Sequence, residues 1–222
     1  MISAGRLRRL AHPILLRYWM KHSTNRTLHT SVGGFRLRVL PTVFHPRYFG
    51  SSAILGKFVE SFNVQGKTFL DMGTGSGVVA LHAARSGAVV TGVDINPNAI
   101  RCASENAAAA GLAIELRQSD LFAAIPQRRF DVIAWNPPFF PKPAQDSAEQ
   151  ALHAGDGYVT ITRFAREARN HLNSAGRILL VLSADLDLSG LESMFRREGF
   201  SVKHAASRKW GFGETMVVLE IQ

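Results

Sequence analysis

The chain has 222 residues, a length that favours one domain of ordinary size. Hydrophobic residues make up 46% and charged residues 19%, a balance that excludes disorder along the whole chain. The single cysteine, Cys102, excludes a disulfide framework and a cysteine-based zinc site. The formal net charge of +9 indicates an anionic partner and leaves the fold open.

The positive charge is concentrated at the start of the sequence. Residues 1–59 hold ten lysines and arginines and no acidic residue, whereas residues 60–222 hold sixteen basic and seventeen acidic residues. We therefore expect a basic arm over residues 1–40, followed by a folded domain over residues 41–222. Residues 1–59 are expected to contact RNA, the ribosome or an acidic partner.

Residues 1–22 are basic and partly apolar, which predicts an amphipathic helix that docks on RNA, on a partner or on the domain itself. Their arginine-rich, acid-free composition also fits a mitochondrial import segment. The apolar runs fall short of the roughly 18 residues that a membrane helix needs. We expect a cytoplasmic protein without a membrane span, with mitochondria as the alternative location.

From residue 66 onward, strand-like and helix-like segments alternate. The predicted strands span residues 67–71, 88–94, 114–116, 130–135, 177–183, 202–207 and 216–221. The predicted helices span residues 78–85, 96–110, 158–172 and 188–197. This alternation predicts an α/β fold with a doubly wound, mostly parallel sheet that helices cover on both faces. The last two strands leave no room for a helix between them and therefore predict an antiparallel hairpin.

A glycine-rich turn follows the first predicted strand and opens a helix. Glycines let the backbone turn sharply and approach a ligand closely, and the free N–H groups of a helix start suit an anion. Val78 stands where a dinucleotide fingerprint requires its third glycine or alanine, so the spacing argues against a nicotinamide cofactor. The expected cofactor contacts in this turn are Asp71, Gly73, Thr74, Gly75 and Gly77. An ordinary strand-to-helix turn is the alternative.

Carboxylates stand at the ends of the next two predicted strands. Asp94 ends the second strand, where a carboxylate can accept hydrogen bonds from both hydroxyls of a ribose. Asp120 follows the third strand and could accept from an adenine amino group. Their neighbours Ile95 and Leu121 complete the expected nucleoside contacts. Each carboxylate alone could be a cap or a turn residue, but ligands of parallel sheets bind at such strand ends.

The most specific signal is Asn136-Pro137-Pro138-Phe139, directly after the fourth predicted strand. Two consecutive prolines end the strand ladder and stiffen the chain. The amide oxygen of Asn136 and the carbonyl of Pro137 would then be two fixed acceptors beside an aromatic plate, Phe139. This combination can hold a planar NH2 group, so these three residues are the candidate catalytic residues, and Asn136 is also expected at the cofactor. The alternative is a proline-rich turn with core aromatics.

Together these motifs resemble class I S-adenosylmethionine-dependent methyltransferases of the amino-methylating type. The resemblance covers about residues 40–222 and implies a Rossmann-like, seven-stranded sheet with a reversed terminal hairpin. It implies S-adenosyl-L-methionine as the cofactor, with the glycine turn at its methionine part, Asp94 at the ribose and Asp120 at the adenine. The eight histidines are scattered and lack ligand spacing with carboxylates, so we expect no metal site.

A narrower resemblance is to the HemK-type protein glutamine methyltransferases. Glu149-Gln150-Ala151-Leu152 with Gly155-Asp156-Gly157 resembles the segment after the same motif in that family, and Val43-Phe44-His45-Pro46 resembles its cofactor-covering entry segment. The sequence departs from the family pattern at Gly50-Ser51-Ser52, where an acidic residue usually accompanies the Ser/Thr. The implied reaction is methyl transfer to a glutamine side-chain amide, typically in a translation release factor.

Other acceptors fit the same residues. The Asn-Pro-Pro-Phe motif is equally compatible with an RNA methyltransferase that acts on an exocyclic amine of adenine or guanine, and the basic arm would suit that partner. A DNA enzyme would need more recognition surface, because the target base must be flipped out of a duplex. A cofactor-binding subunit without catalysis and a small-molecule methyltransferase are the remaining alternatives, and the intact motif argues against the former.

Overall fold

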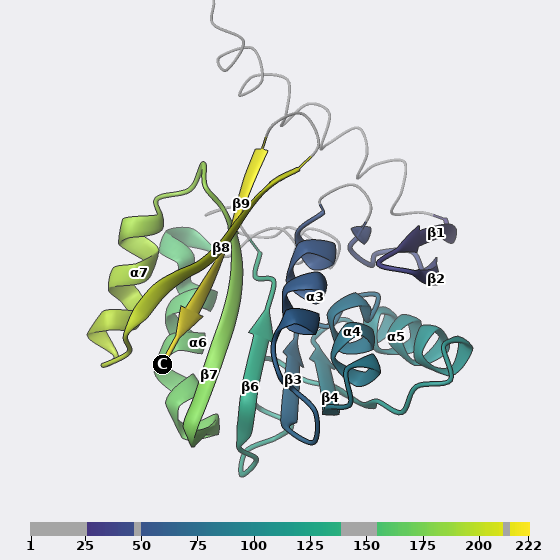
Figure 1. Cartoon of the computed structure of the whole chain (residues 1–222), viewed down its shortest axis with the longest axis horizontal. Coiled ribbons are helices and arrows are strands. Elements are labelled where there is room, and N and C mark those ends of the chain that lie inside the picture. Colours follow the sequence, from purple (N-terminus) through teal and green to yellow (C-terminus); the bar gives the residue numbers. More distant parts are fainter. Residues whose placement is uncertain (1–25, 47–49, 139–154, 211–213) are drawn as a thin grey trace, which may run out of the picture.

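The structure, a computed structural model, describes residues 26–46, 50–138, 155–210 and 214–222. The predicted helix over residues 1–22, the candidate Phe139 and the HemK-like segment at residues 149–152 lie outside the described residues. Within them, the centre of the fold is a seven-stranded sheet with the strand order β5-β4-β3-β6-β7-β9-β8 (Figure 1). The strands are β3 (Thr68–Met72), β4 (Val89–Asp94), β5 (Glu115–Gln118), β6 (Phe130–Trp135), β7 (Leu172–Ser183), β8 (Val202–Trp210) and β9 (Glu214–Ile221).

The sheet is parallel from β5 to β7 and antiparallel at its C-terminal end. Strand β9 pairs antiparallel with both β7 and β8, so the last strand of the chain inserts between two earlier ones. The predicted doubly wound sheet with a reversed terminal hairpin is therefore confirmed. Because β3, β4, β5 and β6 are parallel, the predicted site residues at or after their carboxyl ends lie at one edge of the sheet.

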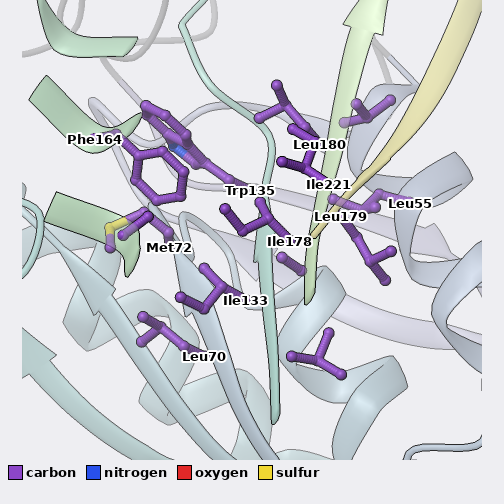
Figure 2. Packing of buried hydrophobic residues seen from close by; sticks show 14 of the residues in the cluster. Leu55, Leu70, Met72, Ile133, Trp135, Phe164, Ile178, Leu179, Leu180 and Ile221 are labelled. Carbon is purple, nitrogen blue, oxygen red and sulfur yellow. The ribbon is translucent and has the colours of Figure 1, made fainter. Parts of the chain in front are cut away.

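Helices pack on both faces of this sheet. They are α3 (Ser51–Ser61), α4 (Val78–Arg85), α5 (Pro97–Ala109), α6 (Val159–Ala168) and α7 (Leu188–Arg197), with 3-10 turns η2 (Asp156–Tyr158) and η3 (Arg169–His171). Leu55 of α3 and Phe164 of α6 are fully buried on opposite sides of β6 (Figure 2). The sheet between them is apolar on both faces, as expected for parallel strands covered by helices.

Local signals set the ends of α5. Asn96 accepts a hydrogen bond from the backbone N–H of Asn98 at 2.9 Å and so caps the helix, with Pro97 in the first turn. Gly111 follows the helix with a φ of +66°, the left-handed conformation that ends helices. Both features agree with the predicted start and stop.

The predicted helix over residues 158–172 is shorter than expected. Helix α6 ends at Ala168, η3 follows, and Leu172 already belongs to β7, five residues before the predicted start of that strand at Arg177. Leu172 pairs with Phe130, and the side chain of Asn173 donates to Asp131 Oδ1 at 2.7 Å. These contacts with β6 draw the segment into the sheet, although its amphipathic pattern continues that of the helix.

The described part of the predicted arm is a β-hairpin. Strands β1 (Leu28–Val32) and β2 (Phe35–Val39) pair antiparallel and alternate between buried and exposed side chains. The buried side chains of β2 join a cluster with Leu81 of α4 and Cys102 of α5. Residues 28–39 are thus packed on the body of the fold, and the domain boundary at residue 40 stays a prediction.

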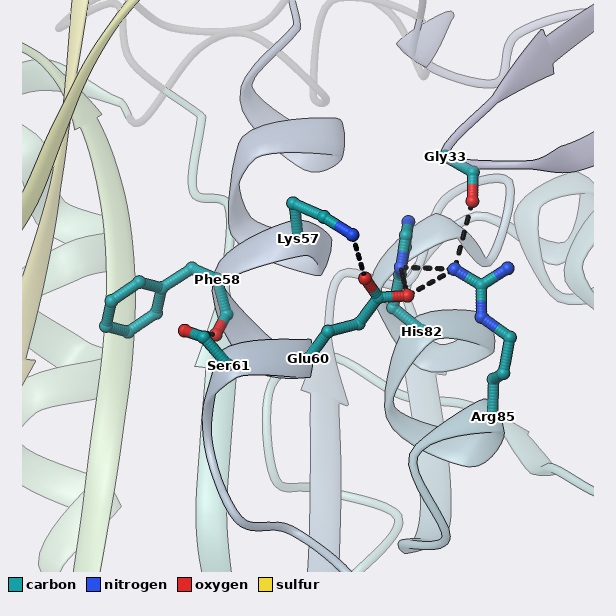
Figure 3. Close-up of polar contacts among 7 residues, drawn as sticks. All are labelled: Gly33, Lys57, Phe58, Glu60, Ser61, His82 and Arg85. Atoms are coloured by element: carbon teal, nitrogen blue, oxygen red, sulfur yellow. Dashed lines mark hydrogen bonds and ion pairs between the residues drawn. The ribbon is translucent and has the colours of Figure 1, made fainter.

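The hairpin is also tied to the body by a polar cluster around Glu60, the first acidic residue of the sequence (Figure 3). Glu60 of α3 bonds Lys57 at 2.7 Å, His82 at 2.8 Å and Arg85. Arg85 in turn donates to the carbonyl of Gly33 at the hairpin turn, over 3.0 Å. Helices α3 and α4 therefore share one carboxylate, and Arg85 links it to the hairpin.

Candidate active site

A cavity of about 390 Å³ opens at the carboxyl ends of β3, β4, β5 and β6. That volume is in the range of small-molecule sites. Nine of the predicted site residues line it: Gly73, Thr74, Gly75, Asp94, Ile95, Asp120, Leu121, Asn136 and Pro137. Residues that are distant in sequence therefore meet around one space, as the strand-end argument predicted.

Two of the predicted residues, Asp71 and Gly77, do not line the cavity. The Asp71 carboxylate accepts from the Thr74 hydroxyl at 2.7 Å and from the backbone N–H of Ala80 at 3.1 Å. Burial raises the pKa of Asp71 to about 7. Gly77 has a φ of +87° and lies against α5, where an added Cβ would come within 3.2 Å of Ala103 Cβ. Both residues support the glycine turn through contacts outside the cavity lining.

Asp94 lies at the end of β4 and joins the glycine turn to the start of α5. Its Oδ2 accepts from the backbone N–H of Gly75, and its Oδ1 from that of Asn96, both at 2.9 Å. Burial raises the pKa of this carboxyl group. Ile95 beside it keeps 46% of its surface exposed, which offers an apolar face at the cavity. The carboxylate is thus fixed at the cavity by two backbone N–H groups, and its predicted role at a ribose stays a prediction.

Asp120 has a partner that the sequence did not indicate. Arg163 of α6 forms an ion pair with Asp120, and both residues line the cavity. Leu121 is buried and adopts a φ of +48°, while Ser119 donates its hydroxyl to the Leu121 carbonyl at 2.7 Å. The turn after β5 is thus held locally, and Arg163 brings a positive charge to this side of the cavity.

Asn136 follows β6, and only one end of its side-chain amide has a hydrogen-bond partner among the described residues. Its Nδ2 donates to the hydroxyl oxygen of Ser52 on α3 at 2.9 Å. Its Oδ1 is buried, and no described residue donates a hydrogen bond to it. A buried acceptor without a donor costs free energy, which a ligand N–H would recover. Trp135, whose ring is tilted by 38° to that of Phe164 with the centroids 4.2 Å apart, also lines the cavity and is apolar.

The entry segment at residues 42–44 also lines the cavity. Asn96 donates through Nδ2 to the Thr42 carbonyl at 3.0 Å, and Asn98 donates to the Thr42 hydroxyl at 3.2 Å. Thr42 itself adopts a φ of +66°. Val43 and Phe44 therefore line the same cavity as Asp94, and the cofactor-covering role that the resemblance implied for this segment stays a prediction. The sequence indicated Asn96 only as a helix cap and did not predict that Asn96 and Asn98 bond Thr42.

The described residues fit S-adenosylmethionine. The glycine turn leaves the backbone open at Gly75, where an added Cβ would meet only one atom within 4 Å, the Gly73 carbonyl oxygen at 3.9 Å. Asp94 and Asn136 both line this cavity, and the buried Oδ1 of Asn136 is an acceptor without a donor among the described residues. In the described part of the chain, no group of three or more metal-ligating side chains occurs. Nor does any described helix combine the length and apolarity needed to cross a membrane.

A seven-stranded sheet with a reversed terminal hairpin, and a ligand-sized cavity at its parallel strand ends, are the arrangement that the resemblance to S-adenosylmethionine-dependent methyltransferases implied. The model of the methyltransferase small domain family matches residues 35–208, and the chain belongs to that family. The predicted cofactor and the predicted activity as an N-methyltransferase are confirmed with it.

Individual relatives point to two kinds of acceptor. A Methanocaldococcus jannaschii protein whose name places it among the protein N5-glutamine methyltransferases is 31% identical over 193 residues, covering 84% of this chain and 95% of the relative. The release factor glutamine methyltransferase of Cereibacter sphaeroides is 38% identical over 167 residues, covering 68% of this chain and 58% of that enzyme. Among solved structures, the T. thermophilus 16S rRNA N2 methyltransferase RsmC, in complex with AdoMet and guanosine, is 25% identical with a TM-score of 0.65, covering 89% of this chain and 50% of that one.

Proposed function

We propose that this chain transfers a methyl group from S-adenosylmethionine to the side-chain amide nitrogen of a protein glutamine, as in the HemK-type enzymes. The observation that carries the proposal is Asn136, which lines the cavity and whose buried Oδ1 has no donor among the described residues. Such an oxygen suits a methyl-accepting nitrogen that carries hydrogens and can donate a hydrogen bond to it. The relatives named as glutamine methyltransferases support a protein amide as the source of that nitrogen.

An amide nitrogen is a weak nucleophile because its lone pair is delocalised. When bound, S-adenosylmethionine supplies an electrophilic methyl group on a positively charged sulfur. Asn136 Oδ1 and the Pro137 carbonyl would accept the two amide hydrogens and turn the nitrogen lone pair toward that methyl group. Such positioning can be worth roughly 7–11 kcal/mol of the barrier. The N–CH3 bond would form as the S–CH3 bond breaks, S-adenosylhomocysteine would leave, and the nitrogen would lose one proton to water. A strong base is not needed before attack, since the nitrogen becomes acidic only as the methyl group arrives.

The roles of the remaining cavity residues follow from their placement. Asp94 would accept from the ribose hydroxyls, and Gly73, Thr74 and Gly75 would face the methionine part of the cofactor. Asp120 and Leu121 would flank the adenine, with Arg163 holding the Asp120 carboxylate. Phe139, outside the described residues, would pack on the planar amide, as the family pattern implies.

A second candidate is methyl transfer to an exocyclic amine of adenine or guanine in RNA. Its specific support is the likeness to the RsmC structure, which contains guanosine, and to a ribosomal RNA small subunit methyltransferase C from Alcanivorax borkumensis, 35% identical over 150 residues. A planar NH2 group on a base would satisfy the same two acceptors. The basic residues 1–59 would suit an RNA partner.

Radiolabel from S-adenosylmethionine, transferred in cell extract and followed by protease or ribonuclease digestion, separates the two. We expect label that survives ribonuclease, is released by protease and maps to methylglutamine after complete enzymatic digestion of the protein. Label lost on ribonuclease treatment would overturn the proposal of a protein glutamine as methyl acceptor and would favour RNA. The Asn136→Ala variant, treated identically, gives the background of other methyltransferases in the extract.

The basic residues 1–59 would contact the partner, whether RNA, the ribosome or an acidic protein. Deleting residues 1–25 tests this without cutting into β1, which begins at Leu28. We expect the deletion to weaken binding to total RNA or ribosomes and to flatten its dependence on salt. An unchanged affinity and salt slope would place the contact elsewhere. Fractionation of cells would test the proposed cytoplasmic location against mitochondria.

A further inference from the structure

The hydroxyl of Ser52 is in direct contact with the candidate catalytic amide. Ser52 lies in the first turn of α3, and its Oγ accepts the hydrogen bond from Asn136 Nδ2 at 2.9 Å, across 84 positions of sequence. Ser52 also lines the cavity, together with Asn136. The contact comes from α3, which carries neither the glycine turn nor the carboxylates at the strand ends.

A carboxamide can be rotated by half a turn with almost no change in shape, which exchanges its oxygen and its NH2 group. Only one of the two orientations presents an acceptor to an incoming amine, because the other presents two donors to a group that is itself a donor. In the structure Nδ2 is the atom that bonds Ser52, and Oδ1 is the buried group with no described donor. The bond to Ser52 thereby holds the plane of the Asn136 amide and leaves Oδ1 as its unpaired atom.

Helix α3 is held firmly enough to act as a reference for this bond. Leu55 and Val59 are fully buried in the main core, and Glu60 near the end of the helix is fastened to His82 and Arg85 of α4. The backbone N–H of Ile54 bonds the Gly50 carbonyl at 2.9 Å, so the first turn is closed around Ser52. A hydroxyl on a fixed turn loses little additional entropy in making the contact.

We propose that Ser52 is a positioning residue for methyl transfer: by accepting from Asn136 Nδ2, it aims Oδ1 at the acceptor nitrogen and makes the site selective for nitrogens that carry a hydrogen. This inference rests on the proposed function for its consequence in catalysis. The hydrogen bond itself is independent of which substrate class supplies the nitrogen.

The neighbouring Ser51 provides a matched control. It is also a serine in the first turn of α3 and is fully buried, but its hydroxyl has no hydrogen-bond partner among the described residues and it does not line the cavity. Ser52→Ala and Ser51→Ala therefore remove the same group from adjacent positions. Ser52→Thr keeps a hydroxyl at position 52 and serves as the rescue.

For Ser52→Ala we expect kcat/KM for the methyl acceptor to fall about tenfold or more, because the amide loses its preferred orientation. The dissociation constant for S-adenosylhomocysteine, measured by calorimetry, should stay within about twofold of wild type. Ser51→Ala should keep most of the activity, and Ser52→Thr should recover most of what Ser52→Ala loses. Equal activities of Ser52→Ala and Ser51→Ala would overturn the proposal, as would a matching loss of cofactor affinity in Ser52→Ala.

A readout without turnover separates this inference from the proposed function. In a 15N–1H spectrum of the protein with S-adenosylhomocysteine, the side-chain amide of Asn136, assigned with Asn136→Ala, should shift in Ser52→Ala and stay in place in Ser51→Ala. An unmoved resonance in Ser52→Ala would contradict the hydrogen bond, whatever the substrate. If the resonance shifts but no methylglutamine forms with wild-type enzyme, the contact stands and the proposed acceptor fails.

Discussion

The hydroxyl of Thr74 donates to the carboxylate of Asp71 across 2.7 Å inside the glycine turn, and both side chains are buried. The sequence placed both residues at the cofactor, but only Thr74 lines the cavity. The carboxylate instead bonds Thr74 and the first helix after the turn, so its function is to fix the loop that the cofactor meets. A buried carboxylate of this kind makes stability depend on pH.

We expect Asp71 to lower the stability of the wild-type protein as pH rises. Burial raises its pKa from 3.8 to about 7, so between these values the folded state retains a proton that the unfolded state has lost. Unfolding free energy should therefore fall as pH rises from about 4 to 7 and level off above. Asp71→Asn does not titrate, so relative to wild type it should gain a few kcal/mol over this window, at about 1.4 kcal/mol per pKa unit. Urea unfolding of both proteins at several pH values measures the difference, and parallel curves would contradict it.

Asn136→Ala should abolish most methyl transfer while leaving the cofactor in place. The variant removes the buried acceptor Oδ1, and the loss of one such polar group from a site typically costs about 10²-fold or more in rate. Binding of S-adenosylhomocysteine should change by less than about threefold. Asn173→Ala, which changes an asparagine bonded to Asp131 outside the cavity, is the matched control. Full turnover by Asn136→Ala would remove Asn136 from the mechanism.

Asp94→Asn should weaken cofactor binding about tenfold, because hydrogen bonds to a charged acceptor are worth roughly 1.5–3 kcal/mol. The same substitution also perturbs the bonds that Asp94 accepts from the backbones of Gly75 and Asn96. Asp187→Asn is the control, since Asp187 caps α7 and lies outside the cavity lining. Calorimetric titration with S-adenosylhomocysteine compares them. Equal affinities for the two variants would exclude a role of Asp94 at the ribose.

Gly77→Ala should destabilise the fold more than Gly111→Ala. Both glycines have positive φ values, of +87° and +66°, and each substitution costs about 1 kcal/mol in conformation alone. An added Cβ at Gly77 would come within 3.2 Å of Ala103 Cβ and 3.3 Å of its Cα, whereas nothing lies within 4 Å of one at Gly111. Crowding should add about 1–3 kcal/mol at Gly77. Equal losses of unfolding free energy in chemical denaturation would show that α5 shifts to accommodate the added Cβ at no cost.

Glu60→Ala should reduce the unfolding free energy by about 1–3 kcal/mol, because it leaves the buried His82 and its neighbour Arg85 without their carboxylate. Hydrogen bonding, led by that from Lys57, lowers the pKa of Glu60 from 4.5 to about 2. Its contribution is complete above about pH 4.5 and is lost as the pH falls toward 2. Glu105→Ala, which breaks an exposed pair with Arg38, should cost less than about 1 kcal/mol. Equal effects in denaturation at pH 7 would argue against this account of the cluster.

The candidate site was predictable where the chemistry follows the strand order. Asp94 ends one strand, Asp120 and Asn136 follow two others, and the carboxyl ends of neighbouring parallel strands share one edge of the sheet. The prediction failed to separate residues that face the cavity from those that support it, as Asp71 and Gly77 show. A one-dimensional motif does not record which side of a tight turn a group faces.

The sequence by itself determined the order of strands and helices from residue 66 onward and the reversed terminal hairpin, and it marked the candidate site residues, because periodicity, glycines and prolines act over a few neighbouring positions. Only the tertiary structure decided the partners: Ser52 for Asn136, Arg163 for Asp120, and Asn96 and Asn98 for Thr42. It also revealed that residues 28–39, within a stretch that charge alone marked as an arm, pack on the body. Such contacts join segments tens of residues apart, and their geometry is set by how whole helices and strands pack.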